Sequence, residues 1–138
     1  MQNPDELAER YVALWNEPDI ERRRATVRAL WADDGMQILQ APQDIRERAA
    51  AIGFFAPTLE ACGHEALVAR VGTAYEEFVA PGKFEFRGRG EVVRLKDVVK
   101  FEWEMVPVTG GEPVGGGTEF VVFDGDGRIR ADYQFIDP

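Results

Sequence analysis

The sequence is poor in the residues that crosslink a chain or bind metals. Among its 138 residues there is one cysteine, Cys62, and one histidine, His64. A single cysteine excludes an intrachain disulfide, which is typical of proteins from a reducing compartment. One cysteine and one histidine are also too few for a zinc site built from these residues. We therefore expect a fold held together by its core, without a metal or another cofactor.

Positive charge and long hydrophobic runs are also scarce. The chain has 25 acidic residues against 16 Lys and Arg, a formal net charge of −9. Because an acidic chain repels polyanions, neither nucleic acid nor an anionic membrane is an expected partner. No apolar run approaches the roughly 18 residues that span a bilayer, and the first residues do not resemble a secretion signal. The sequence predicts a cytoplasmic protein.

The length and composition predict one globular domain over residues 1–138. Hydrophobic residues make up 45% of the chain, and a chain of this size buries roughly 68–70% of its unfolded surface. Up to residue 82 the hydrophobic spacing is helical. It predicts helices that begin after Asn3, after Asp19 (ending at 33–35) and near Gly63, a short helix over 44–52, and an extended stretch over 36–39.

After residue 82 the pattern is that of strands. Four segments rich in Val, Phe, Tyr and Trp cover residues 84–95, 98–108, 117–123 and 128–136. Short turns join the first pair and the last pair, and consecutive strands joined in this way pair antiparallel. We expect an α+β fold in which a strongly bent antiparallel sheet of four strands wraps around three N-terminal helices.

Large aromatic side chains are more numerous than a core of this size needs. They include Trp15, Trp31, Phe54, Phe55, Phe101 and Trp103. In strand 98–108 Phe101, Trp103 and Met105 alternate with charged residues, so that one apolar face looks toward the helices. This face is either core packing or one wall of a cavity for a small hydrophobic molecule.

Three motifs resemble a known family. Residues 10–19 (RYVALWNEPD), 30–34 (LWADD) and 123–129 (FDGDGRI) resemble, in order, the first helix and turn, the end of the second helix, and the last turn of nuclear transport factor 2-like proteins. The closest likeness is to the SnoaL-like and ketosteroid-isomerase-like branch, over residues 5–38 and 63–137. The resemblance implies a cone: a curved sheet around helices, with a deep pocket at the open end. Because this fold hosts isomerases, cyclases, dehydratases and proteins without catalysis, it does not fix the function.

The resemblance also implies three site residues. Tyr11 takes the position of the tyrosine that donates to an oxyanion in ketosteroid isomerase, and Glu119 falls where that enzyme has a protonated carboxylic acid. Two such donors in a dry cavity stabilise an enolate as it forms. The isomerase's general base would fall near Leu39, where this chain has no carboxylate. Asp132 lies near the catalytic aspartate of SnoaL-like cyclases, and we expect it to be the base.

The sequence leaves open on which face of the sheet the Asp132 side chain lies. Apolar residues occupy the odd positions from Ile129 to Phe135, which would turn Asp132 away from the helices. The family's register turns it inward instead. Asp137 and His64 are the alternative bases.

Residues 40–62 are longer than the corresponding family segment. They carry Ile45, Ile52, Phe54 and Phe55, which form either an extra packing layer or a lid over the mouth of the cone. With this segment included, the side chains expected to line the pocket are Trp15, Trp31, Leu39, Phe54, Phe55, Phe101 and Trp103.

Three functions are compatible with these patterns. The protein is an isomerase, cyclase or dehydratase that transfers a proton, a binding protein for a small hydrophobic molecule, or an interaction module that uses the outer sheet face. Strand 117–123 is apolar on both faces, with Phe120 and Val122 alternating with Val121 and Phe123. A strand of this kind needs cover on both sides, so we expect a homodimer packed sheet to sheet.

Overall fold

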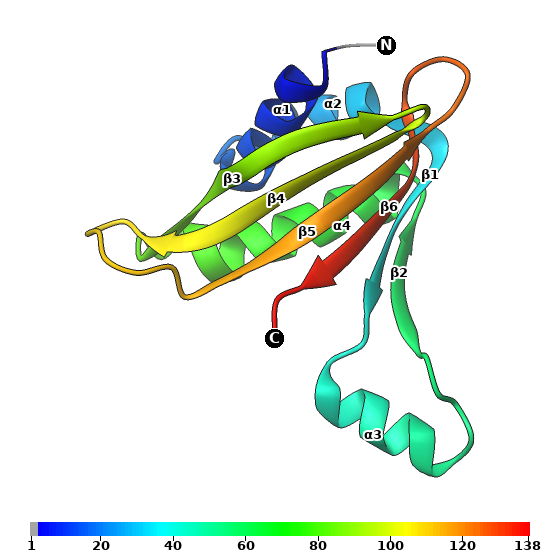
Figure 1. Ribbon diagram of the computed structural model, residues 1–138. Coiled ribbons are helices and arrows are strands. Elements are labelled where there is room, and N and C mark those ends of the chain that lie inside the picture. The colour runs from blue at the N-terminus through cyan, green and yellow to red at the C-terminus, as the bar shows by residue number, and fades with distance from the viewer. Residues whose placement is uncertain (1–2) are drawn as a thin grey trace.

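A computed structural model describes residues 3–138 as an α+β fold, which confirms the predicted class (Figure 1). The elements follow in the order α1 (Pro4–Asn16), α2 (Ile20–Leu30), β1 (Trp31–Gln40), α3 (Gln43–Ala51), β2 (Thr58–Cys62), α4 (His64–Ala74), the π-helical segment η1 (Tyr75–Val79), β3 (Phe84–Leu95), β4 (Val98–Pro107), β5 (Gly115–Phe123) and β6 (Ile129–Ile136). Within the described range no helix is long and apolar enough to cross a bilayer.

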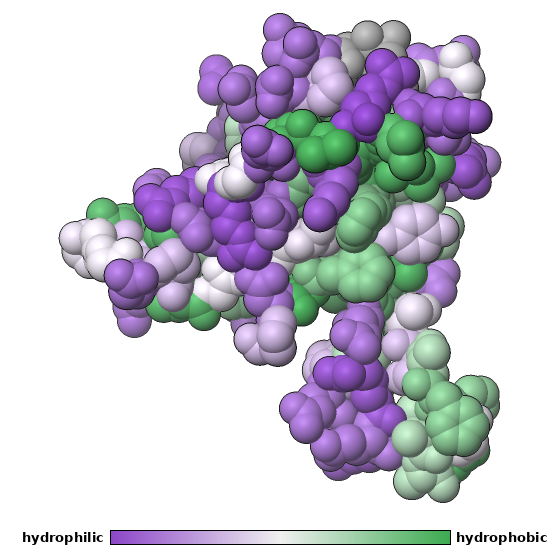
Figure 2. All heavy atoms as spheres, in the orientation of Figure 1, coloured by the Kyte–Doolittle hydropathy of each residue, from purple (hydrophilic) through white to green (hydrophobic). Residues whose placement is uncertain are grey.

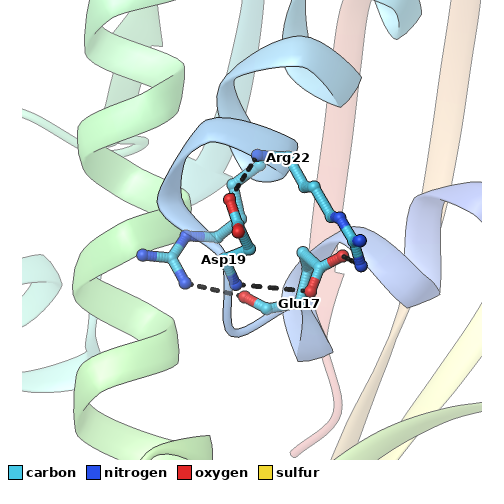
Figure 3. Close-up of polar contacts among 4 residues, drawn as sticks. Glu17, Asp19 and Arg22 are labelled. Carbon is cyan, nitrogen blue, oxygen red and sulfur yellow. Dashed lines mark hydrogen bonds and ion pairs between the residues drawn. The ribbon is translucent and has the colours of Figure 1, made fainter.

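Polar side chains fix the starts of the first two helices, as predicted. The Asn3 side chain accepts a hydrogen bond from the backbone N–H of Asp5 at 2.8 Å. Asp19 accepts from the backbone N–H of Arg22 at 3.0 Å, and Glu17 accepts from the backbone N–H of Asp19 at 3.3 Å (Figure 3). Caps of this kind contribute about 1 kcal/mol each to the free energy of unfolding. The turn that brings α2 back along α1 is therefore encoded locally.

The sheet is larger than the sequence predicts. Strands β3 to β6 form the expected antiparallel series, but β1 and β2 extend it to six strands in the order β2-β1-β6-β5-β4-β3. Strand β1 pairs antiparallel with β2 and parallel with β6. The prediction of a wholly antiparallel four-stranded sheet is corrected to a mixed sheet of six strands, in which β1 and β6 are the parallel pair.

Gly35 lies in β1. The sequence analysis expected it to end the second helix, and this expectation was wrong. Helix α2 ends at Leu30, and the β1–β6 register shifts between Trp31 and Met36. In this bulge a Cβ on Gly35 would lie 2.6 Å from the carbonyl oxygen of Ile129. Glycine is required because the two backbones approach so closely. Residues 33–35, whose types are typical of a turn, therefore lie in a bulged strand.

Helices α1, α2 and α4 pack on the inner face of the sheet, behind it in Figure 1. The core between these layers consists of buried residues that include Leu7, Leu14, Val27, Leu30, Leu67, Val71, Val99, Val121 and Ile129. The outer face has no such cover: Tyr133 is 42% and Phe135 56% exposed. Figure 2 shows hydrophobic side chains on this outer face beside the hydrophilic ones over β3 and β4.

Helix α3 stands apart from the body of the molecule. Strands β1 and β2 carry it on a projecting arm, residues 41–57 (Figure 1). No residue of α3 is buried, and Ile52, Phe54 and Phe55 at the tip are 75%, 64% and 86% exposed. One side of the arm is hydrophilic and the other hydrophobic (Figure 2). The expected packing layer or lid is therefore not formed within the chain.

Candidate active site

A buried cluster of one tyrosine and two carboxyl groups lies between α1 and the sheet. The hydroxyl oxygen of Tyr11 is 2.8 Å from Glu119 Oε1 and 2.6 Å from Asp132 Oδ2. Glu119 pairs with Gln134 and Asp132 with Val121 across β5 and β6, so that the two carboxyl groups are diagonal neighbours on the inner face. The structure thus brings together all three expected catalytic residues.

A β-bulge turns Asp132 inward. The β5–β6 register places Ala131 opposite Val122 but Ile129 opposite Phe123, so that β6 has one extra residue at Arg130. Such a bulge interrupts the alternation of the strand. After it, the even positions face the helices and the odd positions face outward. The alternation of apolar residues predicted that Asp132 faces outward, which is wrong. The resemblance to the family predicted that it faces inward, which is correct.

The hydrogen bonds of the cluster require a proton on one of the carboxyl groups. Tyr11 has a single hydroxyl proton but two carboxyl oxygens within hydrogen-bonding distance. Burial, and after it the nearby Glu119 carboxyl, raises the pKa of Asp132 well above its usual range. Asp132 Oδ1 is buried without a hydrogen-bond partner in the described part of the chain, as suits a neutral acid better than a carboxylate. Asp132 is therefore the protonated member.

Glu119 accepts two hydrogen bonds in the cluster. Its Oε1 accepts from the Tyr11 hydroxyl, and its Oε2 accepts from the indole Nε1 of Trp103 at 2.7 Å. Burial and the two carboxyl groups raise the pKa of Tyr11 well above 10, so that the phenol is neutral. A protonated Asp132 differs from the expectation that this residue is the base.

Two residues that the sequence analysis missed extend the cluster. Gln37, opposite Asp132 in β1, donates through Nε2 to the Tyr11 hydroxyl oxygen at 3.0 Å. Arg70 of α4 donates through Nε to Gln37 Oε1 at 2.9 Å and through Nη2 to Gln134 Oε1 at 3.3 Å. The signal that could have found Gln37 is a polar residue among apolar neighbours in the Met36–Leu39 segment.

A cavity of about 320 Å³ opens beside the cluster. The expected residues Trp15, Leu39 and Trp103 line it together with Tyr11, and so do side chains that were not expected, Val12, Arg70, Phe78, Phe86, Met105, Gln134 and Ile136. Glu119 and Asp132 lie behind Tyr11 and are not part of the wall. A molecule in this cavity would therefore contact Tyr11, whose hydroxyl is hydrogen-bonded to both carboxyl groups.

Four of the expected pocket residues lie elsewhere. Trp31 and Phe101 are core residues whose rings pack against the Tyr11 ring, with centroids 5.7 and 5.0 Å away. Phe54 and Phe55 are on the arm. The large aromatic residues are therefore distributed over the core, the arm and the cavity. Composition alone does not predict which residue lies in which of these regions.

The alternative bases have other partners. His64 Nε2 is 2.9 Å from the backbone oxygen of Trp31, and Asp137 forms an ion pair with Arg89 at 2.8 Å. Neither lines the cavity. Within residues 3–138 no group of three or more His, Cys, Asp and Glu side chains is arranged to hold a metal ion. The acid–base groups at the cavity are those of the tyrosine–carboxyl cluster.

Solved structures with the same fold come from several bacteria. A candidate isomerase of the SnoaL-like family from Agrobacterium tumefaciens is 27% identical, with 100% of both chains covered and a TM-score of 0.78. A SnoaL-like protein from Burkholderia thailandensis is 14% identical, with 99% of this chain and 100% of that chain covered and a TM-score of 0.62. A candidate polyketide cyclase from Sinorhizobium meliloti is 14% identical, with 97% and 99% covered and a TM-score of 0.60. No protein-family profile and no curated protein matches the sequence.

The bent sheet and the helices on its inner face form the fold of nuclear transport factor 2-like proteins. The chain is similar to a SnoaL-like protein over its whole length, in agreement with the resemblance of its three motifs.

Proposed function

We propose that the protein binds a small, largely apolar molecule in the cavity and transfers a proton to and from it, as an isomerase, cyclase or dehydratase does. The observation that carries this proposal is the Tyr11, Glu119 and Asp132 cluster at the base of an apolar cavity. Three buried acidic groups that share one negative charge weaken the fold, and such groups are concentrated at functional sites. The likeness to a candidate isomerase and a candidate cyclase supports the same reaction classes.

The charge distribution suggests a role for each group. Tyr11 is the member that lines the cavity, so its hydroxyl contacts the oxygen of the ligand. When this hydroxyl gives its proton to the ligand, Asp132 replaces it through the 2.6 Å contact. The Glu119 carboxylate accepts the proton that returns from the ligand through the same hydroxyl, and transfer of this proton back to Asp132 through Tyr11 restores the starting state. The pair thus supplies a proton source and a proton acceptor on opposite sides of one relay atom.

Hydrogen–deuterium exchange on a carbonyl compound tests this proposal. The cyclic ketone 2-tetralone is apolar and has exchangeable protons beside its carbonyl group, which NMR follows in D₂O. We expect the protein to accelerate their exchange and the Tyr11→Phe variant to lose about 100-fold of that acceleration. An exchange rate that is equal with wild type, with Y11F and without protein would contradict proton transfer.

One observation favours a second candidate function, binding without catalysis. Both carboxyl groups lie behind Tyr11 and outside the cavity wall. In this case the cavity holds a small hydrophobic ligand and the cluster only fixes the tyrosine. Native mass spectrometry of the purified protein would detect such a ligand, and the exchange experiment would then give no acceleration.

We also propose that two copies of the chain pair through the outer faces of their sheets. Phe120 and Phe135 pack edge to face there, with ring centroids 5.6 Å apart, and Tyr133 lies beside them in β6. An aromatic cluster on an uncovered sheet face is typical of a contact between subunits.

A further inference from the structure

The cavity has one charged residue on its wall among the residues that the structure describes. This residue is Arg70, half-buried on α4, with its guanidinium carbon 5.3 Å from the ring centroid of Trp15. Its Nε and Nη2 donate to Gln37 and Gln134, which hold the guanidinium at the wall. Both partners are neutral amides, so they orient the charge without neutralising it.

Arg70 makes no ion pair within residues 3–138. Six other arginines of the described residues do form an ion pair with a carboxylate. A guanidinium has five N–H donors, and the two amide contacts use two of them. Three donors and a whole positive charge therefore remain at an otherwise uncharged wall. A half-buried charge in such surroundings is stabilised by a counter-ion that enters with the ligand.

We infer that the ligand is a small hydrophobic monocarboxylic acid whose carboxylate binds Arg70. The inference rests on the proposed function, in which the cavity holds a small apolar molecule. A carboxylate fits the fork of the guanidinium and brings one charge. A dianion would leave excess negative charge close to the Glu119 carboxylate. The apolar wall, which includes Leu39, Phe78 and Phe86, accommodates the hydrocarbon part.

This anchor also sets the orientation of the ligand. Gln37 accepts from Arg70 through one end of its amide and donates to Tyr11 through the other. One glutamine side chain therefore spans the distance between the charge and the tyrosine hydroxyl. A ligand held at Arg70 by its carboxylate places atoms a few bonds away beside Tyr11. Arg70 thus acts as a binding and positioning residue, and Tyr11 as the residue at the reacting atoms.

Two probes of the same shape test the inference: 2-naphthoate, which is anionic at pH 7, and its neutral amide, 2-naphthamide. Their dissociation constants are measured by titration calorimetry with wild type, Arg70→Gln and Arg28→Gln. Arg28 is the matched control because it is exposed on α2 and lies 3.8 Å from Glu65, outside the cavity. Circular dichroism establishes that each variant is folded.

We expect wild type to bind 2-naphthoate about tenfold or more tightly than 2-naphthamide, since a hydrogen bond to a charged group contributes about that factor. R70Q should lose this preference by weakening the naphthoate alone, and R28Q should keep it. Equal affinities in wild type, or a preference that survives in R70Q, would overturn the role of Arg70 while leaving a binding cavity. If neither probe binds, the proposed function fails as well. If R70Q does not fold, the test uses the wild-type comparison and the variant Arg70→Lys. We expect Arg70→Lys to keep only part of the preference for 2-naphthoate.

Discussion

The hydroxyl oxygen of Tyr11 lies 2.6 Å from Asp132 Oδ2, although 121 positions separate the two residues in the sequence. The contact joins the first helix to the last strand across the interior. The same hydroxyl also contacts Glu119, so that both carboxyl groups share one hydrogen-bond partner. Changes at any of the three residues should therefore affect the others.

Removing the Tyr11 hydroxyl should weaken the fold. In Tyr11→Phe both carboxyl groups lose a buried partner, and leaving buried polar groups unsatisfied costs about 1–3 kcal/mol. Urea unfolding measures the free energy of unfolding. Tyr133→Phe is the matched control, since it removes the same hydroxyl from an exposed residue and should change stability by less than about 0.5 kcal/mol. Equal stability of Y11F and Y133F would contradict the buried cluster.

The protonated state of Asp132 should appear in the pH dependence of stability. Its pKa is raised in the folded protein, so the folded state holds a proton that the unfolded state releases above its own pKa of about 3.9. This contribution is present at low pH and is lost as the pH rises toward the folded-state pKa. We expect the free energy of unfolding of Asp132→Asn, measured against wild type, to shift in favour of the variant from pH 4 to pH 8.

The matched control for this pH dependence is Asp126→Asn, in the exposed turn before β6. Its difference from wild type should stay within about 0.5 kcal/mol throughout. A constant difference between D132N and wild type over the same range would mean that Asp132 is ionised in the fold.

Asp132 should matter more for turnover than for binding. Asn keeps the size of the side chain but has no exchangeable acid proton to pass to Tyr11. We expect D132N to lower turnover about 100-fold or more and to change ligand affinity little, because a lost proton source acts on the transition state. The rate of 2-tetralone exchange and the affinity for the same ketone are the two measurements. A loss of affinity that matches the loss of rate would indicate a structural role only.

The outer face of the sheet should hold two subunits together. Sedimentation equilibrium at tens of micromolar should give twice the chain mass of 15.5 kDa, and Phe135→Lys should reduce it to the monomer by placing a charge in the apolar contact. Leu95→Lys is the control, since Leu95 is more exposed than Phe135 but lies at the end of β3. A wild-type mass of 15.5 kDa would rule out the dimer.

The arm should open before the rest of the fold. Helix α3 has nine residues and none of them is buried, whereas an isolated helix of this length is marginal in water. We expect trypsin to cut at Arg46 or Arg48 long before it cuts in the core, with amide exchange fastest over the same segment. Protection of the arm equal to that of β5 would mean that it is covered in solution, for example by a second subunit.

Local patterns predicted the strands β3 to β6 to within two residues, because turns with clear signals separate them. The same patterns missed β2 and most of β1. Strand β1 contains Asp33, Asp34 and Gly35, which are typical of a turn, and its place in the sheet depends on β6 at the far end of the chain. Pairing of that kind leaves no trace in neighbouring residues.

The sequence predicted which residues form the buried cluster, but not which carboxyl group holds the proton. Family resemblance indicated Tyr11, Glu119 and Asp132, and the structure brings them together. Which carboxyl group holds the proton depends on donors such as the Trp103 indole, which only the folded chain places beside Glu119. Arg70 and Gln37 belong to no motif, and their contact becomes visible only when α4 lies against β1.

The position of β1 between β2 and β6 has a consequence for the order of events during synthesis. The first strand of the sheet cannot complete its pairing until the last strand has left the ribosome, because its parallel neighbour is made last. Until then the β1–β2 hairpin and the β3–β5 series are two separate pieces of the sheet, and contacts between distant segments also slow folding. The nascent chain therefore leaves the sheet divided until the end of β6 is made, and a product truncated before β6 would be a substrate for chaperones rather than a folded protein.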